Sequence, residues 1–160
     1  MATAPQSTGI DRAVSADDRW KLHDLVSEHW ARVDRISSGC ASEFYEADAT
    51  MRIGALVRDG QASISEYFAD RRDQEDESGR RTRHAISGLV VSATGADACA
   101  LRFLAVVHAG TGDLPFSSGP PATIADFTAS CRHQCDGRWL ITDIRAAVIF
   151  VGPGAASHAK

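Results

Sequence analysis

The stretch that decides the fold is Arg81–Val91, RTRHAISGLVV, in which arginines alternate with Thr82 and His84 before the sequence becomes apolar. This alternation predicts a β-strand, because successive side chains of a strand point to opposite faces of a sheet. Arginine prefers water, so we expect Thr82, His84 and Ile86 to face inward. An inward histidine needs a partner for its ring nitrogens, and the simplest interpretation of a lone one is a hydrogen-bonded structural residue.

Upstream, apolar residues recur at intervals of three and four positions and predict a long helix from Ser15 to about Ser37. Ser15 followed by Asp18 is typical of a helix N-cap. The helix therefore offers one apolar side to a core. Its core-facing stripe consists of Leu22, Leu25, Val26, Trp30, Val33 and Ile36.

One acid interrupts this stripe. Four positions after Trp30 stands Asp34, where an apolar side chain is expected, and His29 lies on the same broad face. Asp34 either marks the fraying end of the helix or is a carboxylate with a buried partner, because an unpaired acid is rarely buried. The residue types alone leave both interpretations open.

The remaining sequence predicts helices first and strands afterwards. A short helix at Ala41–Ala47 and a strand at Asp48–Val57 come before a second amphipathic helix. That helix begins at Gln61 and gives way to the charge run Arg71–Arg81, which we interpret as a solvated helix end and loop. We therefore expect an α+β domain with a mostly antiparallel sheet curled around the first helix. The later strands are expected at Ala98–His108, Thr123–Cys135 and Trp139–Val151, with a hairpin turn at Asp136-Gly137 joining the last two.

The length of 160 residues favours one domain, which we place at residues 15–151. Residues 1–14 lack apolar periodicity and are expected to be disordered, and residues 152–160 are expected to form a flexible tail that could fold over a pocket mouth.

The composition excludes several classes of protein. A net charge of -4 without a basic patch argues against nucleic-acid binding. No apolar run approaches the roughly 20 residues of a membrane helix. We also find no signal peptide, and therefore expect a cytoplasmic protein with reduced thiols at its four cysteines. Those cysteines are Cys40, Cys99, Cys131 and Cys135.

Five segments together resemble the SnoaL-like branch of the NTF2-like superfamily. The resemblance implies a cone-shaped α+β barrel with a deep apolar pocket, and relatives that include scytalone dehydratase, bile-acid dehydratase, polyketide cyclases and non-catalytic dioxygenase subunits. It spans about residues 15–151. The segments are Trp20–Asp34, Phe44-Tyr45-x-x-Asp48-Ala49, Gly60–Phe68, Thr82–Ser87 and Asp136–Trp139.

In the dehydratases of this branch, an aspartate that ends the first helix pairs with a histidine on the strand after the third helix, and Asp34 and His84 match these positions. By the same resemblance His108 matches a second histidine and Arg145 an arginine on the last strand. Both have a plainer interpretation as well, since Arg145 can pair with Asp143 on the surface and His108 can face solvent. The tyrosine that precedes the aspartate in those dehydratases is missing here. The expected pocket residues are His29, Trp30, Tyr45 and Tyr67.

The chemistry of these residue types is consistent with the resemblance. A histidine can remove and return a proton near neutral pH, and an aspartate bonded to one ring nitrogen fixes its tautomer. Three metal-type side chains alternate along one predicted strand, at Cys131, His133 and Cys135, but that spacing is too wide for one zinc ion. We therefore expect no metal and no cofactor.

These inferences combine into one functional prediction. We expect a dehydratase-type lyase or isomerase that acts on a small hydrophobic cyclic or polyketide-like substrate. The alternatives are a non-catalytic pocket protein or dioxygenase subunit, and an epoxide hydrolase or cyclase. The apolar last strand favours a homo-oligomer, and by resemblance a trimer rather than a dimer.

Overall fold

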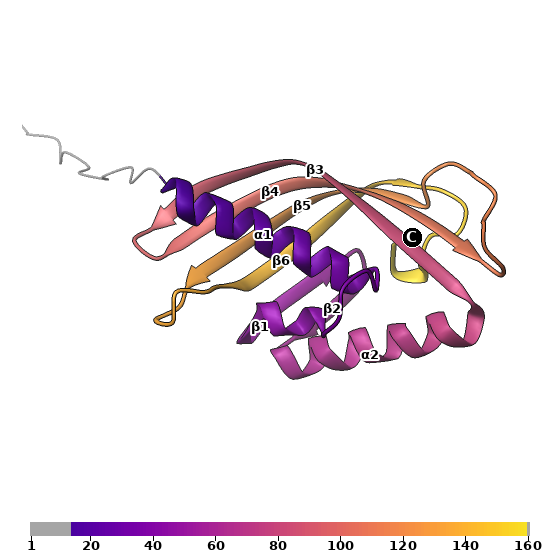
Figure 1. Cartoon of the computed structure of the whole chain (residues 1–160), viewed down its shortest axis with the longest axis horizontal. Coiled ribbons are helices and arrows are strands. Elements are labelled where there is room, and N and C mark those ends of the chain that lie inside the picture. The colour runs from indigo at the N-terminus through magenta and orange to yellow at the C-terminus, as the bar shows by residue number, and fades with distance from the viewer. Residues whose placement is uncertain (1–13, 160) are drawn as a thin grey trace, which may run out of the picture.

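The computed structural model describes residues 14–159, so the predicted disorder of residues 1–13 lies outside the described residues. One six-stranded curved sheet carries helix α1 across its face, while α2 packs beside β1 and β2 and leads into the start of β3 (Figure 1). The strand order is β2-β1-β6-β5-β4-β3, and all neighbours are antiparallel except β1 and β6. The predicted α+β class is confirmed. The elements are α1 (Ala16–Val33), η1 (Ala41–Phe44), β1 (Tyr45–Ile53), β2 (Leu56–Asp59), α2 (Gln61–Ser78), β3 (Arg80–Gly95), β4 (Ala98–Thr111), β5 (Thr123–His133), β6 (Trp139–Val151) and η2 (Ser157–Ala159).

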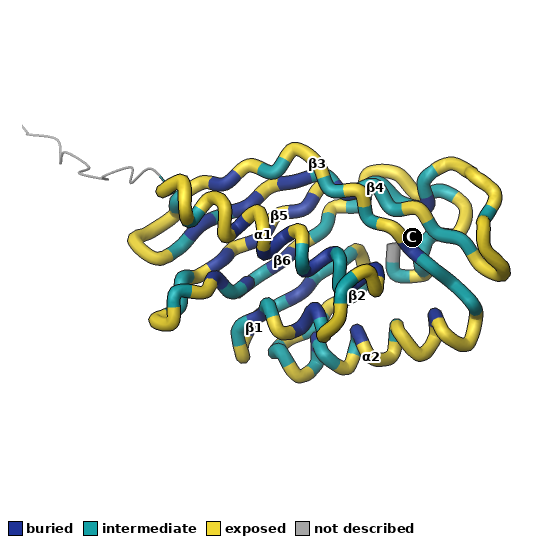
Figure 2. Tube along the Cα trace, in the orientation of Figure 1, coloured by how far each residue is buried: buried dark blue, intermediate teal, exposed yellow. Residues whose placement is uncertain are grey.

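The core lies between α1 and the middle of the sheet. Buried and exposed positions alternate along β4 and β5, as the period of a strand requires (Figure 2). Leu22 of α1 is fully buried, and Leu101 and Phe127 of the sheet are nearly so. Each such side chain stabilises the fold by about 1.5–3 kcal/mol through loss of apolar contact with water.

Helix α1 begins where the sequence predicts and ends earlier. The Ser15 side chain accepts a hydrogen bond from the Asp18 backbone at 3.0 Å, which caps the first turn. The last helical residue is Val33 rather than Ser37, because Asp34 forms the C-cap and Arg35 adopts a left-handed φ of 61°. The chain therefore turns away at the position where Asp34 interrupts the apolar stripe.

Three predicted boundaries were wrong. The short helix at 41–47 is a single turn that ends at Phe44, and the strand predicted at 48–57 is a hairpin of β1 and β2. The run Arg71–Arg81 is not a loop: α2 continues to Ser78, where Gly79 ends it in a left-handed conformation at φ 65°. Part of this run faces inward, since Glu75 is buried.

The C-terminal segment packs against the rest of the domain. The Gly152 amide donates to the Ala122 carbonyl at 2.8 Å, and the Ala55 amide donates to the His158 carbonyl at 3.1 Å. In Figure 1 this yellow segment turns back between α2 and the sheet. Within the described part of the chain, no helix is both long and apolar enough to cross a membrane, and all four cysteines are free.

Candidate functional site

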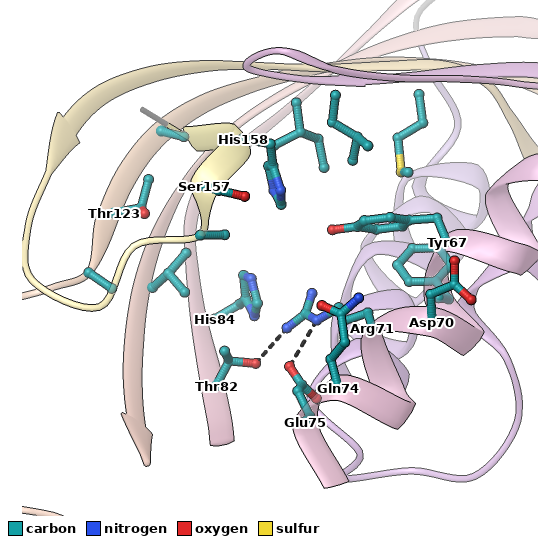
Figure 3. A pocket seen from close by; sticks show the side chains of 18 of the residues that line it. Tyr67, Asp70, Arg71, Gln74, Glu75, Thr82, His84, Thr123, Ser157 and His158 are labelled. Atoms are coloured by element: carbon teal, nitrogen blue, oxygen red, sulfur yellow. Dashed lines mark hydrogen bonds and ion pairs between the residues drawn. The ribbon is translucent and has the colours of Figure 1, made fainter. Parts of the chain in front are cut away.

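A cavity of about 820 Å³ lies between α2, the inner face of the sheet and the C-terminal segment. Its volume is in the range of small-molecule sites, which measure about 300–1,000 Å³. Apolar side chains from β1, β5 and β6 form one part of the wall, among them Met51, Phe127 and Val148. Polar side chains from α2, β3 and the tail form the other part, as Figure 3 shows for Arg71 and His158. The site therefore fits a mainly apolar ligand that carries a polar group.

His84 lines this cavity, and Asp34 contacts His84 from behind the cavity wall. His84 Nδ1 lies 2.6 Å from Asp34 Oδ1, and both side chains are less than a tenth exposed. The His84 backbone amide donates to the other oxygen, Oδ2, at 2.6 Å, and the Thr82 hydroxyl donates to Oδ1 at 3.0 Å. Thr82 and His84 share one face of β3, as the alternation predicts, so one strand presents three donors to one carboxylate.

These bonds determine which nitrogen of His84 carries the proton. An ionised carboxylate can only accept hydrogen bonds, so Nδ1 must be the donor to Asp34. In the neutral ring, Nε2 then holds a free electron pair. Nε2 has no hydrogen-bond partner among residues 14–159, and no fully buried side-chain nitrogen or oxygen there lacks a partner. Nε2 therefore borders the cavity, which His84 lines.

The pKa values of the pair support a neutral, basic imidazole. Burial lowers the pKa of His84 below its ordinary value of 6.5, and the bond and charge of Asp34 offset this only in part. Burial alone would raise the pKa of Asp34, but the hydrogen bonds and charge of His84 outweigh it and hold that pKa below 3.8. Near neutral pH the pair therefore consists of a carboxylate and a neutral ring that can accept a proton.

The four expected pocket residues all line the cavity. The Trp30 ring stacks on His84, with centroids 4.4 Å apart at 27°, and restrains its orientation. His29 Nε2 lies 2.9 Å from the Tyr45 hydroxyl. This hydroxyl therefore has a partner within the protein and is not free to bind a substrate. The hydroxyl of Tyr67 points into the open space, as Figure 3 shows.

His29 should make the stability of the fold depend on pH. Burial lowers its pKa from 6.5 to about 3, so the folded state stays unprotonated where the unfolded chain binds a proton. Stability should therefore rise with pH, and His29 should contribute a loss of about 2 kcal/mol between pH 7.5 and 5. Urea unfolding of wild type and His29→Gln at both pH values measures this. The variant should lose less stability in acid, and equal losses would contradict the prediction.

Two expected catalytic residues lie outside the site. On β4, Val107 lines the cavity, so the neighbouring His108 points to the opposite face and is exposed. On β6, Ile144 lines the cavity, and Arg145 lies on the outer face with its Nε 2.8 Å from Asp143 Oδ1. The alternation of strand side chains thus removes both residues from the chemistry, and Arg145 forms the surface pair that the sequence also allowed.

Among the polar residues of the cavity wall that sequence reasoning missed are Arg71, Glu75 and His158. Arg71 Nε donates to Glu75 Oε1 at 2.9 Å, and Arg71 Nη2 donates to Thr82 Oγ1 at 2.7 Å. A signal for Arg71 and Glu75 exists, because they continue the inward stripe of Ile64 and Phe68 at intervals of three and four. Charged residues on an inward stripe mark a site for the same reason that Asp34 does.

Among residues 14–159, no three side chains of His, Cys, Asp or Glu lie close enough together to bind one metal ion. Of the alternating trio on β5 and its turn, Cys131 is buried and Cys135 is exposed. Burial raises the pKa of the Cys131 thiol to about 12, which keeps it protonated.

Comparison with known proteins agrees with this geometry. A family model described as the SnoaL-like domain matches residues 14–145. No curated protein matches the sequence.

Solved structures share the architecture at low sequence identity. A candidate scytalone dehydratase from Novosphingobium aromaticivorans is 9% identical, with a TM-score of 0.69 over 88% of this chain and 89% of that one. A candidate aromatic ring hydroxylase from the same species is 17% identical, with a TM-score of 0.72 over 92% of this chain and 100% of the other. ActVI-ORFA from Streptomyces coelicolor is 12% identical, with a TM-score of 0.72 over 87% and 100%. At these identities the likeness shows the fold alone.

Proposed function

Since the chain belongs to the SnoaL-like domain family, we propose that it is a cofactor-independent lyase, a dehydratase, that acts on an apolar cyclic or polyketide-like substrate through Asp34 and His84. The observation that carries this proposal is the 2.6 Å contact between His84 Nδ1 and Asp34 Oδ1 at the wall of the cavity. A neutral imidazole with one nitrogen bonded to a carboxylate and the other open to a ligand has the arrangement of a general base.

The reaction uses one proton twice. His84 Nε2 takes a proton from the carbon next to the substrate carbonyl, and the electron pair of the C–H bond forms an enolate. The enolate then collapses, the C–O bond to the β-hydroxyl breaks, and the imidazolium returns the proton to the leaving oxygen. Water and a conjugated carbonyl compound are formed, and His84 is neutral again. Asp34 stabilises the imidazolium in between, because its charge lies on the other ring nitrogen.

A panel of cyclic β-hydroxyketones tests the proposal. Wild-type protein should form the conjugated enone, which ultraviolet absorbance detects, and His84→Ala should not. The same ketones without the hydroxyl should exchange their α-protons in D₂O, which proton NMR follows in the absence of a leaving group. A pocket that binds these ketones with neither turnover nor exchange would exclude proton abstraction.

That outcome would favour the second candidate, a non-catalytic pocket protein. The cavity of about 820 Å³ supports it, because a pocket of that size can hold a small ligand without reacting with it. The two candidates differ in one measurable respect. A binding protein should keep its ligand affinity in His84→Ala and show no reaction in either form.

The rate should depend on pH through His84. Because its pKa is lowered by burial, the neutral ring is present at and above pH 6.5 and is lost in acid. We expect kcat/KM to be level at neutral pH and to fall tenfold per pH unit in acid, with a midpoint below 6.5. A pH–rate profile on the reactive ketone checks this. A midpoint above 7 would mean that the active group is not this buried neutral histidine.

We also propose that the chain forms a homotrimer. The end of β6 exposes Ile149, Phe150 and Val151 by 50%, 64% and 49%, and a run of large exposed apolar residues is typical of a protein interface. Light scattering should report three times the 17.1 kDa mass of one chain. Phe150→Glu should lower that mass, and a wild-type monomer or dimer at micromolar concentration would contradict the proposal.

A further inference from the structure

Arg71 is fixed in place before any ligand binds. Its Nε donates to Glu75 and its Nη2 donates to Thr82, at 2.9 and 2.7 Å. The Glu75 side chain is only 7% exposed and the Arg71 side chain 20%. A guanidinium has five N–H groups in a rigid fork, so two are used by these partners. Arg71 also interacts with the Tyr67 hydroxyl: burial raises the pKa of Tyr67, and the charge and hydrogen bonding of Arg71 oppose that rise. The remaining N–H groups are available to a ligand. The dashed bonds in Figure 3 show this arrangement at the cavity wall.

The same arginine is joined to Asp34 and His84. The Thr82 hydroxyl accepts from Arg71 and donates its own proton to Asp34 Oδ1 at 3.0 Å. A continuous chain of hydrogen bonds therefore runs from Glu75 through Arg71, Thr82 and Asp34 to His84. Arg58 and Arg80 also line the cavity, but Arg71 is the cavity arginine that this chain holds beside the base.

The open side of Arg71 faces the space that His84 faces. In Figure 3 the guanidinium, the Tyr67 hydroxyl and the rings of His84 and His158 surround one central space. Burial first, and then the charge of Arg71, lowers the pKa of His158. A ligand in this space would have the base on one side and a fixed cation on another.

Proton removal next to a carbonyl develops negative charge on the carbonyl oxygen. A preorganised donor in a cavity with little water stabilises such a charge more than water does, because it needs no reorientation. His108 and Arg145, which the sequence suggested for this task, point away from the cavity. Arg71 has the charge, the fixed geometry and the position that the task requires.

We propose that Arg71 is the catalytic residue that binds the developing oxyanion, and that the substrate is an apolar cyclic compound with a carbonyl oxygen beside the carbon that loses its proton. Glu75 and Thr82 are positioning residues that hold the guanidinium. The proposal rests on the proposed role of His84 as the base. It goes further, because it names the cation that recognises the carbonyl oxygen of that substrate and the two residues that hold this cation in place.

A phenolate imitates the enolate in charge and shape and does not react. The probe is 4-nitrophenol, whose phenolate absorbs at longer wavelength than the phenol, so a pH titration with excess protein reports the ionised fraction of bound probe. Bound to wild type, the probe should have a pKa about one unit lower than in bulk water, which means that the protein favours phenolate over phenol about tenfold. Arg71→Gln should abolish this preference, and Arg71→Lys should restore part of it. Arg102→Gln, on the exposed face of β4, is the matched control and should behave like wild type.

Removal of Arg71 leaves the buried Glu75 carboxylate without its partner, so the single variant could unfold. The double variant Arg71→Gln/Glu75→Gln removes that orphaned charge and keeps the test open. Thr82→Val should weaken the phenolate preference, and Thr82→Ser should restore it, which loss of packing alone would not produce.

The outcomes separate this proposal from the proposed function. His84→Ala should keep the phenolate preference whether or not the protein is a dehydratase, so a failed turnover assay leaves this test intact. The proposal is supported if Arg71→Gln and Arg71→Gln/Glu75→Gln both lose the preference for phenolate while Arg102→Gln retains it. An equal preference in wild type and folded Arg71→Gln, or in the double variant, overturns it, as does a wild-type protein that binds no phenolate.

Discussion

His84→Ala is expected to reduce turnover by about 10²–10⁴-fold, the range that general acid–base groups contribute. The reason is that Nε2 is the open basic nitrogen at the cavity wall, and alanine provides none. Asp34→Asn should be nearly as damaging although it is close in shape. The new amide can donate to His84 Nδ1, which would move the ring proton to Nε2 and remove the free electron pair from the cavity. Steady-state kinetics on the reactive ketone measures both.

The double variant Asp34→Asn/His84→Ala should be scarcely slower than His84→Ala alone, because residues that act as one unit are not additive. His108→Ala and Arg145→Ala are the matched controls, since both side chains point away from the cavity. Their turnover rates should stay within about twofold of wild type, far less than the loss of at least about 10²-fold expected when a general base is removed. Multiplicative losses in the double variant, or a large loss in His108→Ala, would show that the site is organised differently.

Trp30→Ala is expected to lower the free energy of unfolding by about 3–5 kcal/mol, as large-to-small changes of buried aromatic residues do. Trp30 is 6% exposed and packs on three rings: it stacks on His84, and its edge contacts with Phe127 and His29 have centroids 5.2 and 4.9 Å apart. The change leaves a void beside the catalytic ring, so activity should fall together with stability. Denaturant unfolding gives the energy and kinetics the rate.

Trp20→Ala provides the comparison for this prediction. Trp20 lies on the same helix and is 73% exposed, so its removal should change stability by no more than about 0.5 kcal/mol. If Trp30→Ala costs no more than Trp20→Ala, the ring stack contributes nothing to the fold.

The Asp34–His84 contact could be anticipated because two simple periodicities point to it. Asp34 breaks the apolar stripe of α1, which repeats every 3.6 residues. His84 lies on the inward face of a strand whose outward face carries arginines. Each of these polar residues would be costly to bury alone. Paired with each other, the two side chains can both be buried, and in the structure His84 Nδ1 lies 2.6 Å from Asp34 Oδ1.

His108 and Arg145 were misjudged because a resemblance aligns positions and does not fix strand parity. A shift of one residue turns a side chain to the other face of a sheet. For Arg145, the pairing of β5 with β6 contains an irregularity between Ser130 and Cys131. It changes the inward positions of β6 from Trp139 and Ile141 to Ile144, and no glycine in the sequence marks it. For His108 the residues do give a signal, because the alternation of β4 is unbroken and places Val107 inward and His108 outward.

Arg71 and Glu75 were missed for a different reason. A dense charge run is usually solvated, so the two inward charges are hidden among the other charged and polar residues of Arg71–Arg81. Only the packing of α2 against β3 separates the charges that enter the cavity from those that face water. The hydrogen bond from Arg71 to Thr82, at 2.7 Å, is the contact that does so.

The protonation state of His84 tests the central claim most directly, because it needs no substrate. Nitrogen NMR of the histidine rings, with the His84 signals identified by their loss in His84→Gln, distinguishes the two neutral tautomers and the imidazolium. At pH 7 the account predicts a neutral ring that is protonated at Nδ1, with a free Nε2, and a different tautomer or hydrogen-bond pattern in Asp34→Asn. A proton on Nε2 in the neutral wild-type ring, or an imidazolium that persists to pH 8, would contradict it.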